Sequence, residues 1–146
     1  MMIRKITADD REIFLKFMKD FYNSEAVLHP IDVQFNINTF EEMMRSEEYL
    51  VGYFIIHEEK EIGYILLSKS FSPEVGGPVV WVEEVYVLPE YRSMGFGKKA
   101  FEFVDANIPY CRLRLEVEPD NFRAKKFYDE LGFKPLPYEQ LIKDTV

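Results

Sequence analysis

The sequence predicts one α/β domain built around a mixed β-sheet. Strand-like and helix-like patterns follow one another along the chain in the order βααβββαβαβ, which is typical of this fold class. The 146 residues are 47% hydrophobic and 16% aromatic, enough to bury a core of ordinary size. No repeat or low-complexity segment divides the chain. We therefore expect a single domain over residues 1–146.

The first strand and helix are expected before residue 23. Residues 2–7 alternate weakly and indicate a short strand, and Thr7 can cap the helix that follows. That helix carries six apolar side chains at helical spacing, which predicts one buried face: Ile13, Phe14, Phe17, Met18, Phe21 and Tyr22.

The second helix is predicted to begin at Thr39. Residues 24–38 contain Pro30 and show no clear period, which indicates a loop or a broken helix. Thr39 is followed three residues later by Glu42, the spacing of a capping box.

Five strands and two helices are expected in the rest of the chain. Two strands, residues 49–57 and 61–70, are joined by a charged turn, and a Gly- and Pro-containing connection leads to a central strand at 79–88. A helix follows with Phe96, Ala100, Phe103 and Val104 inward, then a half-buried strand at 111–118. Asp120 or Asn121 caps the last helix, Gly132 ends it, and a short strand is predicted at residues 140–143.

Composition restricts the classes of partner. The chain has 18 basic and 26 acidic residues and a formal net charge of −8, which disfavours nucleic acid as the main partner. The acidic balance is compatible with a cationic substrate, and it is equally an ordinary route to solubility. Its single cysteine, Cys111, excludes an internal disulfide, indicates a reducing compartment, and is typical of a small buried hydrophobe. His29 and His57 show no metal-ligand spacing with it. No signal peptide or membrane-length run is present, so a cytoplasmic protein without a membrane partner is expected.

Residues 91–99, YRSMGFGKK, predict a binding site for an anion. They follow the strand at 79–88 and precede a helix, so backbone N–H groups and the positive end of a helix point to one place. The loop contains Arg92, Lys98 and Lys99 and no acid. A Walker loop needs a different glycine spacing, and a dinucleotide fingerprint needs a third glycine after Gly95 and Gly97.

Two stretches of the sequence resemble a known family. Residues 82–99, VEEVYVLPEYRSMGFGKK, look like the acetyl-coenzyme A motif of the Gcn5-related N-acetyltransferases, the GNAT family. Residues 115–133, LEVEPDNFRAKKFYDELGF, resemble that family's following strand–helix motif. The resemblance implies a mixed sheet of six to seven strands flanked by four helices, acetyl-CoA as the cofactor, coenzyme A as the product, and no metal.

The resemblance also implies where the cofactor is held. Its pyrophosphate is expected on the glycine loop, and its pantetheine arm is expected to pair with the strand backbone like an added strand. Asn121 would hold this arm, cap the helix, or do both. The implied cofactor-binding residues are Val85, Tyr86, Val87, Arg92, Ser93, Met94, Gly95, Phe96, Gly97, Lys98, Asn121 and Tyr128.

The implied reaction is direct attack of an amine on the acetyl thioester. By resemblance, Tyr128 hydrogen-bonds the departing sulfur, although periodicity alone would place it in the core. Glu83 is the first candidate for the general base and Glu116 the second, with an ion pair to Arg112 or Arg114 as the other explanation for Glu116. Strict strand alternation predicts that Glu83 and Glu84 point to opposite faces.

The acceptor site is implied near the first two helices. We expect it to involve Tyr22, Glu25, His29, Asp32, Trp81 and Glu84. A small cationic amine is the favoured acceptor, such as a polyamine, an aminoglycoside or an amino-acid amine. A protein N-terminus or lysine, and a non-catalytic acyl-CoA sensor, are the alternatives. The resemblance leaves a homodimer open.

Overall fold

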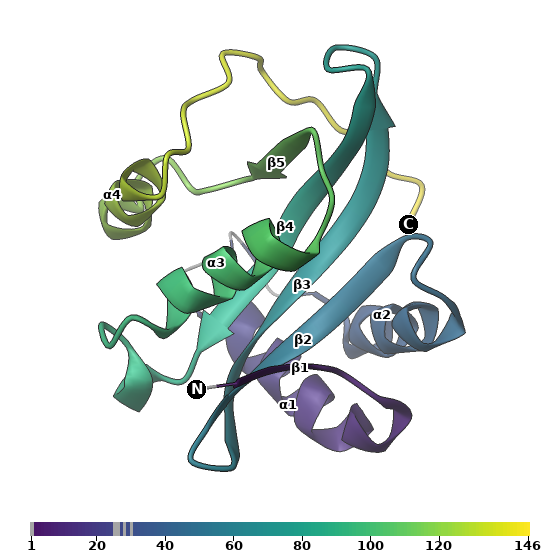
Figure 1. Ribbon diagram of the computed structural model, residues 1–146. Helices are drawn as coiled ribbons and strands as arrows, with labels where there is room; N and C mark the ends of the chain where they lie inside the picture. Colours follow the sequence, from purple (N-terminus) through teal and green to yellow (C-terminus); the bar gives the residue numbers. More distant parts are fainter. Residues whose placement is uncertain (1, 25–26, 28, 30) are drawn as a thin grey trace.

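The computed structural model describes residues 2–24, 27, 29 and 31–146, and these form an α/β fold around one mixed sheet (Figure 1). The sheet order in this part of the chain is β1-β2-β3-β4-β5. The first four strands are antiparallel neighbours, and the last runs parallel to β4. The strands are β1 Met2–Lys5, β2 Leu50–His57, β3 Lys60–Ser72, β4 Gly77–Val87 and β5 Arg112–Leu115.

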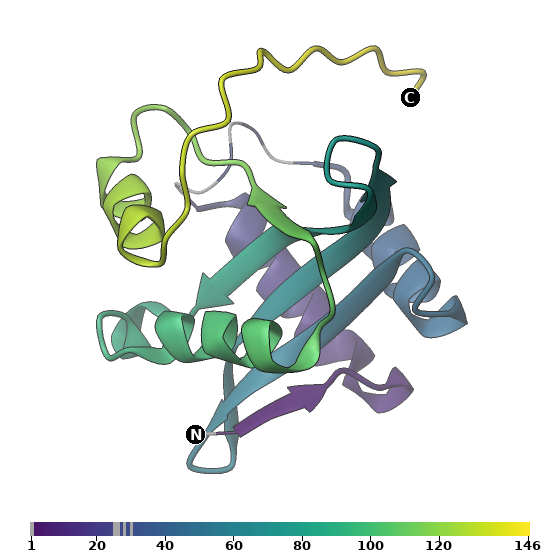
Figure 2. The ribbon, with the colours of Figure 1, turned by 45° about the horizontal axis from the view of Figure 1, so that its top comes forward.

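Four α-helices of the described chain cover the two faces of the sheet (Figures 1 and 2). Two lie on one face and two on the other. They are α1 Arg11–Tyr22 and α2 Val33–Arg45, then α3 Phe96–Asn107 and α4 Phe122–Glu130. Short 3-10 turns, Ala8–Asp10 and Pro89–Tyr91, precede α1 and follow β4.

Each face of the sheet has its own apolar core, and β3 contributes alternately to both. Tyr64 and Leu66 pack under α1 and α2, whereas Ile65 and Leu67 pack under α3. This is the period of two that a strand buried on both sides requires. The predicted apolar face of α1 is confirmed, with Phe14, Phe17, Met18 and Phe21 buried.

The predicted start of the second helix is wrong. The helix α2 begins at Val33, where the carboxylate of Asp32 accepts a hydrogen bond of 2.8 Å from the backbone N–H of Gln34. Thr39 lies inside the helix, and its hydroxyl donates to the carbonyl of Phe35. The apolar side chains of Val33 and Phe35 in the first turn of α2 are exposed. The apolar residues there therefore do not repeat at helical spacing in the sequence. The proposed break at Pro30 lies outside the described residues.

The C-terminal strand and the strand count are also wrong. Residues 140–143 belong to no strand, so the described chain has five strands in place of six or seven. The strand predicted at 111–118 is confined to Arg112–Leu115, because only Val79 to Val82 of β4 lie beside it. Cys111 is exposed just before β5, not buried as expected.

The turn between β2 and β3 is strained. His57 pairs with Lys60, so Glu58 and Glu59 form a two-residue turn, with φ of 50° and 65°. A side chain costs about 1 kcal/mol or more in this left-handed region, where Asn-Gly is preferred. We expect E58N/E59G to raise the free energy of unfolding by about 1–2 kcal/mol and the Tm by several degrees. Thermal unfolding checks this, and an unchanged or lower Tm would contradict it.

Candidate active site

A length of unpaired strand edge lies where β4 and β5 separate. Their pairing stops at Val82 and Leu115, while β4 continues to Val87 and pairs there with β3 alone. The N–H of Leu88 bonds to Ile62 on the β3 side, and bonding direction alternates along an antiparallel strand. The N–H and C=O groups of Val85 and Val87 therefore face the gap toward β5. An extended ligand could pair with them as a strand does.

A β-bulge at Glu83 corrects the expectation that the two glutamates point to opposite faces. Leu66 pairs with Glu84 and Leu67 with Val82, so Glu83 is an extra residue without a partner on β3. The Glu83 carboxylate accepts a hydrogen bond of 2.6 Å from the hydroxyl of Ser68. Alternation places Ser68 on the face of β3 that carries Tyr64 and Leu66, beneath α1 and α2. Because the bulge resets alternation, both carboxylates lie on that face.

Glu84 is buried between two tyrosines. It is 4% exposed, and its two oxygens accept bonds of 2.7 Å from the hydroxyl of Tyr22 and 2.6 Å from that of Tyr64. Burial raises the pKa of Glu84, the two hydroxyls oppose the rise, and the charge of Glu83 adds to it. Burial and the neighbouring Glu84 raise the pKa of Tyr22. Glu83 is the exposed carboxylate of the pair, so an amine arriving from solvent would reach it first.

The other residues expected at the acceptor site are only partly gathered. Trp81 pairs with Ser68 across β3 and β4, and the guanidinium of Arg114 lies 4.2 Å from its ring centroid. His29 is exposed, and Asp32 caps α2. Glu25 lies outside the described residues. The structure thus brings together Tyr22, Glu83 and Glu84, with Trp81 adjacent through Ser68.

The glycine loop joins the end of β4 to the start of α3. Gly95 caps α3 with φ of 87°, a conformation that favours glycine and leaves the first N–H groups of the helix free for an anion. A Cβ at Gly97 would meet the ring of Phe127 at 3.4 Å, so this glycine lets α3 and α4 pack closely. Residues 92–95 are exposed, while Phe96 is buried and anchors the loop.

Two arginines hold this loop in place. Arg92 donates through Nε to the carbonyl of Val87 at 2.8 Å, and its guanidinium lies 5.3 Å from the ring centroid of Tyr86. Arg123, from the first turn of α4, donates to the hydroxyl of Ser93 at 2.7 Å. Ser93 has φ of 63°, so this bond stabilises an unfavourable backbone conformation. Positive charge from two elements therefore lies at the loop.

Tyr128 and Asn121 lie on α4, on the α3 side of the sheet. The Tyr128 ring contacts Phe101, Phe127 and Phe133, with centroids 5.4–5.9 Å apart, and burial raises the pKa of its hydroxyl. Its ring is partly buried and packs against the core on the α3 side, in line with its apolar period. The side chain of Asn121 accepts from the N–H of Ala124 at 3.1 Å, so the capping role expected for Asn121 is confirmed.

Glu116 follows β5 and is exposed. The arginines offered as its ion-pair partners are engaged elsewhere, since Arg112 bonds Glu74 at 2.8 Å and Arg114 lies over Trp81. In the part of the chain that the structure describes, no group of three or more His, Cys, Asp or Glu side chains could hold a metal ion. Across the same residues, no helix is long and apolar enough to span a membrane.

Comparison with known proteins identifies the family. The protein-family model described as "Acetyltransferase (GNAT) family" matches residues 11–133 of this sequence. This chain belongs to the GNAT family.

Two relatives and one solved structure illustrate the similarity of this GNAT chain to known proteins. It is 32% identical over 92 residues to a 5-NmdU N-acetyltransferase of Pseudomonas phage PaMx11, covering 63% of the chain and 66% of the relative. It is 37% identical over 79 residues to a thialysine N-epsilon-acetyltransferase of Bos taurus, covering 51% and 45%. The chain thus spans two thirds or less of the length of these relatives.

The solved structure is AAC(6')-Iy in complex with the bisubstrate analog CoA-S-monomethyl-acetylneamine. The GNAT chain matches it with a TM-score of 0.79 at 18% identity, covering 99% of the chain and 98% of that structure. At this identity the likeness shows the fold alone.

Sequence reasoning missed three residues of this GNAT site: Ser68, Tyr64 and Arg123 as the partner of Ser93. Tyr64 could have been found, because a buried tyrosine and a buried carboxylate each need a hydrogen-bond partner. Ser68 could not, since its contact with Glu83 depends on the bulge. Arg123 is 30 residues from Ser93, and only the packing of α4 brings it to the loop.

Proposed function

We propose that this protein transfers an acetyl group from acetyl-CoA to the primary amine of a small cationic molecule. The observation that carries the proposal is the separation of β4 from β5 beyond Val82, which leaves the backbone of Val85 and the N–H of Val87 without a strand partner beside the glycine loop. A ligand with an extended amide arm and a pyrophosphate fits such an arrangement. The single cysteine supports the cytoplasm as the proposed compartment.

The coenzyme would be held by backbone and by cations. The pantetheine arm would lie along Val85 and Val87, and the phosphates would accept from N–H groups between Ser93 and Lys98. Arg123 is placed to add a charge-assisted bond at Ser93. When bound, the coenzyme supplies a thioester that an amine can attack without a covalent enzyme intermediate.

Residues on the two sides of the gap would have different roles: one would accept the proton of the amine, and the other would stabilise the departing sulfur. An amine with the pKa of lysine, about 10.4, is neutral in only about one molecule in a thousand at pH 7. Glu83, exposed on the α1 side, would accept the proton directly or through water. Tyr128, on the α3 side, would stabilise the departing sulfur by a hydrogen bond from its hydroxyl, which is protonated at neutral pH and whose pKa burial raises further. The N–H of Val87 would face the carbonyl oxygen.

A small cationic acceptor is supported by the charge of the site. Glu83 and Glu84 lie on one face with Tyr22 and Trp81 beside them, and a carboxylate pair with neighbouring aromatic rings attracts an ammonium group. Thialysine and neamine, named for the relatives, are amines of this kind.

An acceptor screen tests this function. The protein is incubated with acetyl-CoA and a panel of polyamines, aminoglycosides, amino acids and short peptides, and free thiol release is measured. We expect turnover with at least one small cationic amine. Turnover only with peptides would transfer the assignment to a protein acetyltransferase. Acetyl-CoA that raises the Tm without any turnover would indicate a sensor. The absence of both a Tm shift and turnover would exclude the proposed function.

A further inference from the structure

A buried carboxylate and two tyrosine hydroxyls form one hydrogen-bonded cluster beside the gap. Glu84 of β4 accepts bonds of 2.7 Å from the hydroxyl of Tyr22 and 2.6 Å from that of Tyr64, one on each oxygen. The side chain is almost fully enclosed, so burial closes the rest of the carboxylate to solvent. Glu84 therefore offers no oxygen to a molecule that arrives in the gap.

Tyr22 is the member of this cluster that borders solvent. Tyr64 is 0% exposed, whereas Tyr22, the last residue of α1, is only half-buried. The Tyr22 ring packs edge-on against Phe21, with centroids 5.0 Å apart and planes at 84°, which holds the ring in place. Its hydroxyl donates to Glu84 and keeps two lone pairs that can accept. The oxygen of Tyr22 is thus an acceptor for a donor outside the cluster.

The bond to Glu84 makes this hydroxyl a stronger acceptor than a free one. Burial raises the pKa of Tyr22, and the charges of Glu84 and Glu83 raise it further, so the hydroxyl stays protonated beside both carboxylates. A hydroxyl that donates to a carboxylate is polarised, and its oxygen accepts a second hydrogen bond more strongly. The charge of Glu84 therefore acts at the surface through Tyr22.

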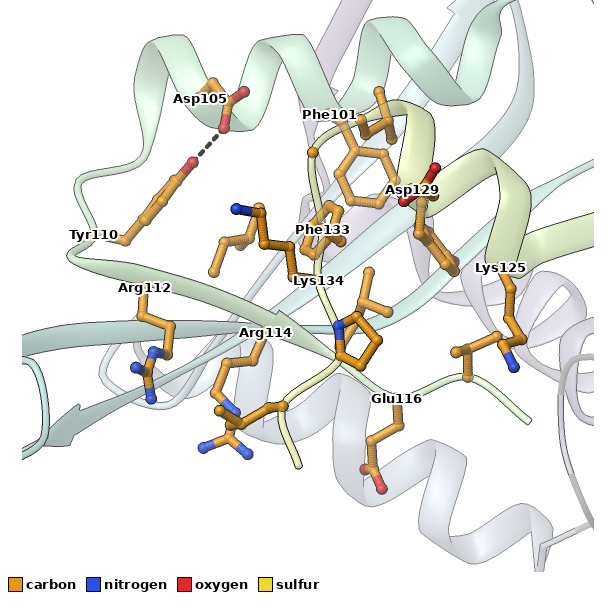
Figure 3. Close-up of a pocket in the computed structure, with 18 of the residues that line it drawn as sticks. Phe101, Asp105, Tyr110, Arg112, Arg114, Glu116, Lys125, Asp129, Phe133 and Lys134 are labelled. Atoms are coloured by element: carbon orange, nitrogen blue, oxygen red, sulfur yellow. Dashed lines mark hydrogen bonds between the residues drawn. The ribbon is translucent and has the colours of Figure 1, made fainter. Parts of the chain in front are cut away.

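A cation on β5 restricts where an ammonium group can lie. Arg114 projects from β5 on the same side as Arg112 (Figure 3). Its guanidinium lies 4.2 Å from the ring centroid of Trp81, on the face of the sheet that carries the two glutamates. Like charges repel, so an ammonium group is favoured on the β4 side of this face. The acceptors there are the carboxylate of Glu83 and the hydroxyl of Tyr22.

We propose that Tyr22 is a specificity-determining residue for the acceptor: its hydroxyl oxygen accepts a hydrogen bond from one N–H of the substrate amine, while Glu83 accepts from another. Glu84 is then a positioning residue, which acts through Tyr22 and does not touch the amine. The inference rests on the proposed acetyl transfer and names the second group that holds the ammonium.

A hydroxyl suits this position better than a second exposed carboxylate. The ammonium must lose a proton before its nitrogen attacks, and two carboxylates in contact with it would favour the charged form. Glu83 takes the proton, and the neutral primary amine keeps two N–H groups. One of them stays bonded to Tyr22 while the nitrogen lone pair attacks the thioester carbon. Tyr22 thus binds the charged and the neutral amine alike.

Tyr22→Phe tests the contact, because it removes one hydroxyl and keeps the ring against Phe21. The probe is the polyamine, aminoglycoside or amino acid with the highest kcat/KM in the acceptor screen. Its KM should rise by about 10-fold or more, since a hydrogen bond to a charged group is lost. The contact is the same before and during attack, so kcat should fall by less than about threefold and the KM for acetyl-CoA should not change. Steady-state kinetics separates these parameters.

Tyr64→Phe is the matched comparison. Either substitution takes one donor from Glu84, but Tyr64 is enclosed and cannot reach the amine. The KM for the amine should therefore rise by less than about threefold. An equal rise in the two variants would show that Tyr22 only supports Glu84, and would overturn the proposal. Circular dichroism and the Tm establish that both variants fold.

Glu84→Gln tests whether the buried charge acts through Tyr22. Glutamine keeps the shape and one acceptor oxygen, and the loss of charge should raise the KM for the amine by about fivefold. In Tyr22→Phe/Glu84→Gln, that KM should be no more than about twice the value for Tyr22→Phe alone, because the two residues act as a unit. Effects that multiply would mean that Glu84 meets the amine itself, and would refute this inference alone. A parent chain that acetylates no small amine would refute the proposed function together with it.

Discussion

Replacing Glu83 by Gln should lower kcat by about 100-fold at pH 7, and the loss should be greatest at low pH. Glu83 is the exposed carboxylate on the α1 side of the gap, and its only hydrogen bond within the described chain is the one from Ser68. A positioned general base contributes about 100-fold or more. Without it, the reaction depends on solvent to deprotonate the amine, so the remaining rate should rise with pH. A kcat profile between pH 6 and about 9 measures both effects.

Glu116→Gln is the control for this prediction. Glu116 is also exposed and also lies near the gap, so the two variants lose the same charge. We expect Glu116→Gln to change kcat by less than about threefold. A larger loss from Glu116→Gln than from Glu83→Gln would transfer the role of base to Glu116. Because the hydroxyl of Ser68 donates to the Glu83 carboxylate, Ser68→Ala should also lower kcat, but by less than Glu83→Gln.

Replacing Tyr128 by Phe should lower kcat by about 10- to 100-fold with little change in the KM for acetyl-CoA. The substitution removes one hydroxyl and keeps the ring contacts with Phe101, Phe127 and Phe133. A donor that acts mainly on the leaving sulfur stabilises the transition state more than the bound substrate. Steady-state kinetics separates the two parameters.

Tyr110→Phe provides the comparison. The hydroxyl of Tyr110 bonds Asp105, on the same side of the sheet, and burial with this carboxylate raises its pKa to about 12. Its loss should leave kcat unchanged. If Tyr128→Phe turned over like the parent protein, Tyr128 would be a core residue only. A fall in the Tm of Tyr128→Phe with unchanged kcat would likewise indicate that Tyr128 only stabilises the core.

Local sequence patterns predicted most of the helices and strands. They were wrong where one pattern is compatible with two different structures. The apolar face of α1 was recognisable because four buried side chains repeat at helical spacing. Thr39 and Glu42 have capping-box spacing in the middle of α2, where the true cap is Asp32. The strand expected at 140–143 has the composition of a strand, but no strand among the described residues pairs with it.

The same division applies to the candidate site. The loop with Gly95 and the cap at Asn121 depend on residues within a few positions, and both were predictable. The bulge at Glu83 depends on the register with β3, where Leu66 and Leu67 pair on either side of it. Strict alternation therefore assigned one of the two glutamates to the wrong face.

By itself, the sequence determined the family, the glycine loop before α3 and the helix that Asn121 caps and that carries Tyr128, because glycine conformations, helix caps and apolar periods act between near neighbours. Only the tertiary structure decided which carboxylate is accessible. Glu84 is enclosed by hydroxyls 62 and 20 residues away, while Glu83 is turned outward by a bulge. It also decided where β4 leaves β5 and opens the gap. These features arise from pairing between distant strands, which no short stretch of sequence encodes.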